Sequence, residues 1–165
     1  MSDELRKQIV LWLNKEMWNV DVEVSSHNLN AYGKALLICI ARNGVIPQEQ
    51  RNWVTGYLAS MGAPEELSHE LSTYETTGKD LKEVISSSPA ANQTRTALIY
   101  DAMKAWSVDD GNYKDYKPLI DKLANQLGIS ISTIKQIEGI YQEEKALKQK
   151  KLEVLLPKTV PDYSK

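Results

Sequence analysis

The chain has 165 residues, of which 42% are hydrophobic and 25% are charged, a composition that excludes disordered and fibrous proteins and suits one soluble globular domain. With 20 basic against 22 acidic side chains, its net charge of −2 disfavours nucleic acid as a main partner. The single cysteine, Cys39, excludes an internal disulfide and favours a reducing compartment. No signal-peptide or transit-peptide pattern is found, so we expect a cytoplasmic protein. The longest apolar run, residues 35–41, is too short to span a membrane.

The N-terminal segment predicts a helix followed by an extended linker. Apolar side chains at three- and four-residue spacing form one stripe that we expect to face the core: Leu5, Ile9, Trp12, Leu13 and Met17. Residues 20–24 alternate between apolar and acidic side chains, but no second convincing strand could pair with them. Residues 1–27 are therefore predicted to be a helix and a linker that pack on the main domain.

The next segment predicts a central helix and shorter helices around it. Residues 30–42 contain the run 35–41, which is apolar on every face and indicates a helix surrounded by others. Asn43-Gly44 predicts a break, and a helix that begins near Pro47 is expected to end at Gly62. Further short helices are predicted from Pro64 to about residue 74 and at 81–85. Residues 86–89 are interpreted as a loop.

The second half repeats this layout. An apolar helix over 97–106 is followed by an Asp-Gly turn, a helix with apolar spacing, and the sequence Leu127-Gly128-Ile129. Gly111 lies 67 residues after Gly44, and Gly128 lies 66 residues after Gly62, which indicates an internal repeat. A last helix begins after Ser130 or Ser132, and its lysine-rich far end is expected to be exposed. The prediction is an all-α domain over 28–156, with about seven to eight helices in related halves 28–88 and 89–156, and a flexible tail at 157–165.

Most sequence patterns for catalysis or metal binding are missing. His27 and His69 have no second histidine or cysteine at helical spacing, so no zinc motif is present. The glycines form neither a dinucleotide-binding nor a P-loop pattern. Cys39 lies within the apolar run, where a thiol is typically a structural residue of the core.

An acidic turn at 109–115 is the best candidate site for a cation. Asp109, Asp110 and Asp115 supply carboxylates, which hard cations prefer, just before a predicted helix. An EF-hand is excluded, because Gly111 at loop position six would place Lys117 at position twelve. The favoured interpretation is that Asp115 or Asn112 caps the helix and that the acids interact favourably with its positive N-terminal dipole, and a weak divalent-cation site is the alternative.

Two further features have a structural and a functional interpretation. Asp101 lies within the apolar run 98–103, and exposure to solvent is favoured over an inward orientation toward a cation or a partner group, because buried carboxylates need compensation. The four tryptophans are expected to anchor the core rather than to form a ligand cage: Trp12, Trp18, Trp53 and Trp106.

The repeated pattern of turn, helix and glycine resembles the tellurite-resistance TerB-like family over about residues 30–145. The second copy carries it in Asp110-Gly111, Leu119, Leu123, Ala124 and Leu127-Gly128-Ile129-Ser130, and the first copy in Asn43-Gly44, Glu49, Trp53, Leu58 and Met61-Gly62. The resemblance implies an all-α fold of two related halves, a cytoplasmic role in stress or tellurite response, and acidic residues that bind divalent cations. The family's aspartate before the first turn glycine is Asn43 here, so Glu49 is the contributor expected from that half.

The leading hypothesis is a non-enzymatic TerB-like binding module that meets protein partners and takes up a divalent cation, Ca²⁺ or Mg²⁺, at the acidic turn. The alternative is a metal-free helical adaptor that mediates protein–protein interaction. A metal-dependent hydrolase is the weakest hypothesis, because few convergent ligands can be identified.

Overall fold

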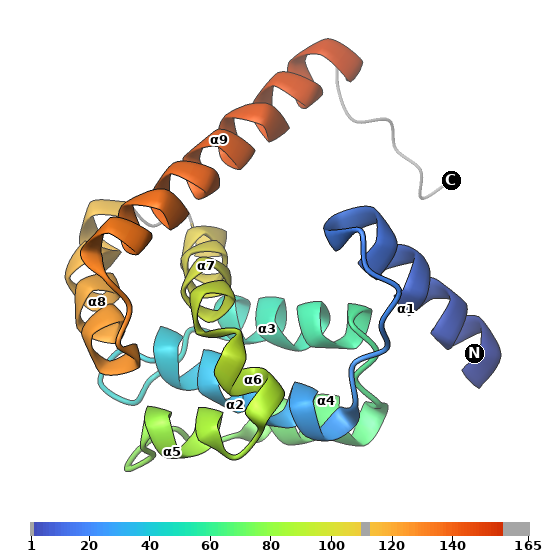
Figure 1. Ribbon diagram of the computed structural model, residues 1–165, viewed down its shortest axis with the longest axis horizontal. Coiled ribbons are helices and arrows are strands. Elements are labelled where there is room, and N and C mark those ends of the chain that lie inside the picture. The colour runs from blue at the N-terminus through green and yellow to red at the C-terminus, as the bar shows by residue number, and fades with distance from the viewer. Residues whose placement is uncertain (1, 110–112, 157–165) are drawn as a thin grey trace.

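The structure is a computed structural model that describes residues 2–109 and 113–156 (Figure 1). These residues form nine α-helices and one short 3₁₀ helix, with no strand among them. The first helices in chain order are α1 (Asp3–Trp18), α2 (Ser26–Ile40), α3 (Gln48–Ser60), α4 (Glu65–Thr73), α5 (Leu81–Ser86) and α6 (Pro89–Gln93). The remaining ones are α7 (Arg95–Trp106), the 3₁₀ helix η1 (Ser107–Asp109), α8 (Tyr113–Leu127) and α9 (Ile131–Leu155). The all-α prediction is confirmed.

The central helix is α2, as the sequence predicts. Its buried side chains lie on all sides of the helix, and α3, α4, α5, α6 and α7 pack around it. Ala35, Leu36, Leu37 and Ile40 are completely buried. A helix that is apolar all round must be covered by other helices to remove these side chains from water, and this requirement organises the first half of the fold.

The predicted break at Asn43-Gly44 is a tight turn between α2 and α3. Asn43 and Gly44 both have a positive φ, 52° and 80°, and an isolated bridge pairs Arg42 with Val45 across them. Asparagine adopts this left-handed conformation more readily than most residues, which gives Asn43 a conformational role here. The glycines that follow α3 and α8, Gly62 and Gly128, also have positive φ, as helix-ending glycines commonly do.

The interpretation of residues 86–89 as a loop is wrong at its C-terminal end. Ser88 caps α6 by accepting a hydrogen bond from the Ala91 N–H, and Pro89 occupies the first turn of the helix. The fully buried Ser88 hydroxyl also donates to the Asn28 side chain over 2.7 Å, which attaches α6 to α2. A serine followed by proline is thus a helix start here rather than a break.

The expected core-facing stripe of α1 is wrong. Leu5, Ile9, Trp12 and Met17 are exposed, whereas Val10 and Asn14 of the same helix are buried. The Asn14 side chain donates to the Val22 carbonyl over 2.6 Å, which fixes the linker against the helix. The linker at 20–24 is extended without forming a strand, as predicted.

In the second half, α7 packs on α8 and α9 as well as on α2 and α3. Trp106 is buried at the end of α7, where its indole N–H donates to the Ile40 carbonyl over 3.4 Å and its ring stacks on Tyr116 of α8. The first turns of α9 are held by the buried stripe Ile134, Ile137 and Tyr141. Beyond that stripe α9 extends away from the other helices (Figure 1), and its residues 142–155 are exposed as predicted.

None of the described helices is both long enough and apolar enough to cross a membrane.

Candidate functional site

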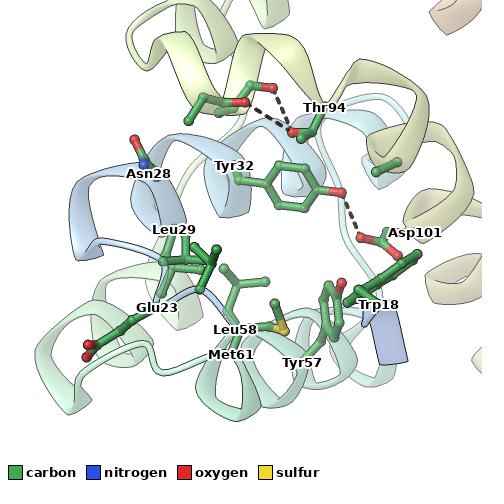
Figure 2. A pocket seen from close by; sticks show the side chains of 15 residues that line it. Trp18, Glu23, Asn28, Leu29, Tyr32, Tyr57, Leu58, Met61, Thr94 and Asp101 are labelled. Carbon is green, nitrogen blue, oxygen red and sulfur yellow. Dashed lines mark hydrogen bonds between the residues drawn. The ribbon is translucent and has the colours of Figure 1, made fainter. Parts of the chain in front are cut away.

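A pocket of about 420 Å³ lies between α2, α3 and the α6–α7 segment (Figure 2). Apolar side chains from three segments form its walls. They are Leu29 of α2, Leu58 of α3 with Met61 just after it, and Val22 and Val24 of the linker. The volume and the mainly apolar lining are typical of small-molecule sites in proteins. The α1 helix contributes only its last residue, Trp18, to the lining.

Small side chains on one wall create this space. Three alanines and a threonine of the α6–α7 segment line the pocket. They are Ala90 and Ala91 of α6, Thr94 between the two helices, and Ala97 of α7. The hydrogen bond from Ser88 to Asn28 attaches this wall to α2. Leucine or isoleucine at these alanine positions would fill the volume, so the alanines keep the pocket open.

A buried carboxyl group forms the polar end of the pocket. Asp101 lies in the middle of α7 and is only 3% exposed. The Tyr32 hydroxyl of α2 donates a hydrogen bond to Asp101 Oδ2 over 2.7 Å, and Tyr57 of α3 is a second hydroxyl partner. Figure 2 shows the three side chains together, with Trp18 beside them and the apolar residues farther from the carboxyl group. The cluster therefore joins three helices at one end of the pocket.

Burial sets the ionisation of this cluster. It raises the pKa of the Asp101 carboxyl group to about 6, although the tyrosine hydroxyls and the charge of Lys104 act in the opposite direction. The pKa values of the Tyr32 and Tyr57 hydroxyls are raised by burial first and then by the nearby Asp101 charge. Near neutral pH the cluster is a carboxylate that accepts hydrogen bonds from neutral phenols.

A smaller pocket of about 270 Å³ shares Trp18, Tyr57 and Asp101 with the first. Its lining includes Lys104, whose ammonium nitrogen lies 3.2 Å from a carboxylate oxygen of Glu144 on α9. The nearest cation to Asp101 along α7 is thus already paired with another acid.

Sequence reasoning favoured exposure of Asp101, and the structure overturns that interpretation. The carboxyl group is buried because tyrosine hydroxyls from two other helices compensate for the lost water. A lone acid within an apolar run was the only available signal. Tyr32 and Tyr57 were missed because nothing in their spacing links them to Asp101, which lies 69 residues after Tyr32.

Two of the four predicted tryptophan anchors are also not core residues. Trp106 is buried and Trp53 packs against the core, but Trp12 and Trp18 are 64% and 49% exposed. Trp18 instead lines both pockets from the end of α1. Cys39 is a buried core residue whose thiol pKa is raised by burial, in keeping with the structural role expected for it.

The predicted cation-binding residues are only partly covered by the described structure. Glu49 is exposed in the first turn of α3, and Asp115 is exposed in the first turn of α8. Asp109 ends η1, which packs on α3, while Asp110 lies outside the described residues. Within the described residues, no group of three or more acidic, histidine or cysteine side chains could hold a metal ion. Both the cation site and the alternative of helix capping stay predictions.

Comparison with known proteins gives one close structural relative. No family model and no curated protein matches the chain. A tellurite resistance protein from Nostoc punctiforme, solved by crystallography, is 30% identical and superposes with a TM-score of 0.89 over 98% of this chain and 99% of its own. The likeness extends over the whole helical order described above, including α1 and α9. The chain belongs to the tellurite-resistance TerB-like family.

Proposed function

We propose that this chain is a non-enzymatic, cytoplasmic TerB-like binding module that acts in tellurite or stress response by binding a small ligand in the pocket between α2, α3 and α7. The observation that carries the proposal is a preformed pocket of about 420 Å³ whose apolar walls end at the buried Asp101 carboxyl group. A binding role is favoured over catalysis because this carboxyl group is already engaged by Tyr32 and Tyr57.

Membership of a tellurite-resistance family supports the proposed role in tellurite or stress response. The cation, Ca²⁺ or Mg²⁺, is a separate part of it and would bind at the acidic turn through Asp109, Asp110 and Asp115, with Glu49 from α3. The pocket and the acidic turn involve different residues, so either proposal can fail without the other.

A pocket-filling variant tests the proposal. Ala97→Leu adds a larger side chain to the pocket wall, and Thr96→Leu adds the same side chain at an exposed neighbour on α7 that does not line the pocket. In cells whose own copy of the gene is deleted, we expect wild type and Thr96→Leu to restore growth on tellurite, and Ala97→Leu to fail. Melting temperatures of the purified variants establish that each is folded.

Full tolerance of tellurite with a folded Ala97→Leu variant would contradict a role for the pocket.

One observation favours the adaptor as a second candidate: α1 exposes an apolar face that includes Leu5, Ile9 and Trp12. An adaptor that binds its protein partner through this face predicts the opposite pattern in the same assay, with tolerance lost in Trp12→Ser and retained in Ala97→Leu.

A further inference from the structure

The charges that line the pocket are all negative. Its ionisable carboxyl groups are those of Asp101 and Glu23, and among the described residues no lysine, arginine or histidine lines it. Glu23 is exposed, and its carboxylate oxygen lies 3.6 Å from the ammonium nitrogen of Lys7, a residue that does not line the pocket. Asp101 is therefore the one fully buried charge that a bound molecule would meet.

The hydrogen bonds at Asp101 are supplied by neutral groups. Tyr32 and Tyr57 provide hydroxyl donors, which stabilise a carboxylate without neutralising its charge. Lys104 contributes an attractive charge, but its ammonium group is paired with Glu144. The charges of Asp101, Lys104 and Glu144 sum to one negative charge. This end of the pocket would therefore stabilise a buried cation.

Aromatic rings surround the same end. Trp18, Tyr32 and Tyr57 line the pocket next to Asp101 (Figure 2), and the faces of such rings attract cations, most strongly when water is excluded. The other walls, including Leu29, Leu58 and Met61, are apolar and would accept a hydrocarbon group.

We propose that the pocket binds a small apolar molecule that carries one positively charged ammonium group, with the ammonium group bound to Asp101 and the hydrocarbon group against Leu29, Leu58 and Met61. The inference rests on the proposed function, in which this pocket is the ligand site. An anionic ligand of the same shape would be repelled by Asp101, and a neutral one would lack the ionic interaction.

Three probes of equal chain length isolate the head group: n-hexylammonium, 1-hexanol and hexanoate, titrated into the protein by calorimetry at about pH 7.5, where Asp101 is ionised. A hydrogen bond between charged groups is about twice as strong as one between neutral groups, so we expect hexylammonium to bind at least about tenfold more tightly than hexanol. Hexanoate should bind most weakly. Asp101→Asn should reduce the preference for hexylammonium over hexanol to less than about threefold.

Asp21→Asn is the matched control, because it removes the same charge from the exposed linker beside the pocket without altering the lining. It should leave the preference for hexylammonium unchanged. Equal binding of all three probes to wild type would overturn the ammonium inference and leave the pocket as a ligand site. If no probe binds, the inference and the ligand pocket of the proposed function both fail. The wild-type comparison decides the inference even if Asp101→Asn does not fold.

Discussion

Asp101 couples the stability of the fold to pH. Its folded-state pKa of about 6 lies above the ordinary value of 3.8, so the folded protein binds the proton more tightly than the unfolded chain does. The stabilisation from this proton is fully present below about pH 3.8 and is lost as the pH rises through about 6.

The corresponding prediction compares wild type with Asp101→Asn, in which the group cannot titrate. Between about pH 3.5 and about pH 7, the unfolding free energy of wild type should fall by about 3 kcal/mol relative to the variant. Chemical denaturation of both proteins over this range measures the difference, and other carboxyl groups cancel in the comparison. A wild-type unfolding free energy that stays constant or rises with pH relative to that of the variant would contradict the assigned burial.

Asp101 also shows why part of the site could not be predicted. The residue type and its apolar neighbours were visible in the sequence, but its favourable burial depends on Tyr32 and Tyr57, which belong to two other helices. Hydrogen bonds that compensate a buried charge are tertiary contacts, and helical periodicity carries no information about them.

At the scale of single helices, periodicity correctly predicts which side chains are buried where one face of a helix is clearly apolar or where every face is apolar. The α2 helix and the first turns of α9 follow the pattern, and their apolar side chains are buried. The α1 helix departs from it, because its Val10 and Asn14 are buried while Leu5 and Trp12 stay exposed. Periodicity identifies a helix but does not determine which of its faces has a neighbour.

The acidic turn between α7 and α8 gives the prediction that belongs to this scale. A divalent cation held by Asp109, Asp110 and Asp115 would bind the folded protein but not the unfolded chain, so it would raise the melting temperature. After EDTA treatment, Ca²⁺ or Mg²⁺ at about 100 times its Kd should add about 2.7 kcal/mol, or roughly 5–10 °C, at matched ionic strength.

Asp110→Asn should abolish this shift, while Glu75→Gln, which removes an exposed acid elsewhere, should preserve it. If neither cation changes the melting temperature of wild type, the cation site is wrong. Glu49 and Asp115 already lie in first turns of helices, where the helix dipole favours negative charge.

For the whole molecule, the order of helices and turns could be predicted because glycines and capping residues mark the helix ends. Gly62 and Gly128 occupy corresponding places after α3 and α8, and both have positive φ. The pocket could not be predicted, because it lies between the two predicted halves: α2 and α3 form one side, and α6 and α7 form the other. Its volume depends on how these helices pack and on the small side chains, such as Ala91 and Ala97, that line its α6–α7 wall.

The most direct test of the account is to locate where a neutral apolar molecule binds. Amide chemical shifts of the isotope-labelled protein are followed by NMR during a titration with 1-hexanol, which requires no particular head group. We expect the largest changes around the pocket, at residues such as Leu29, Leu58 and Ala97. Saturable changes confined to another surface, such as the exposed face of α1 or the far end of α9, would contradict it.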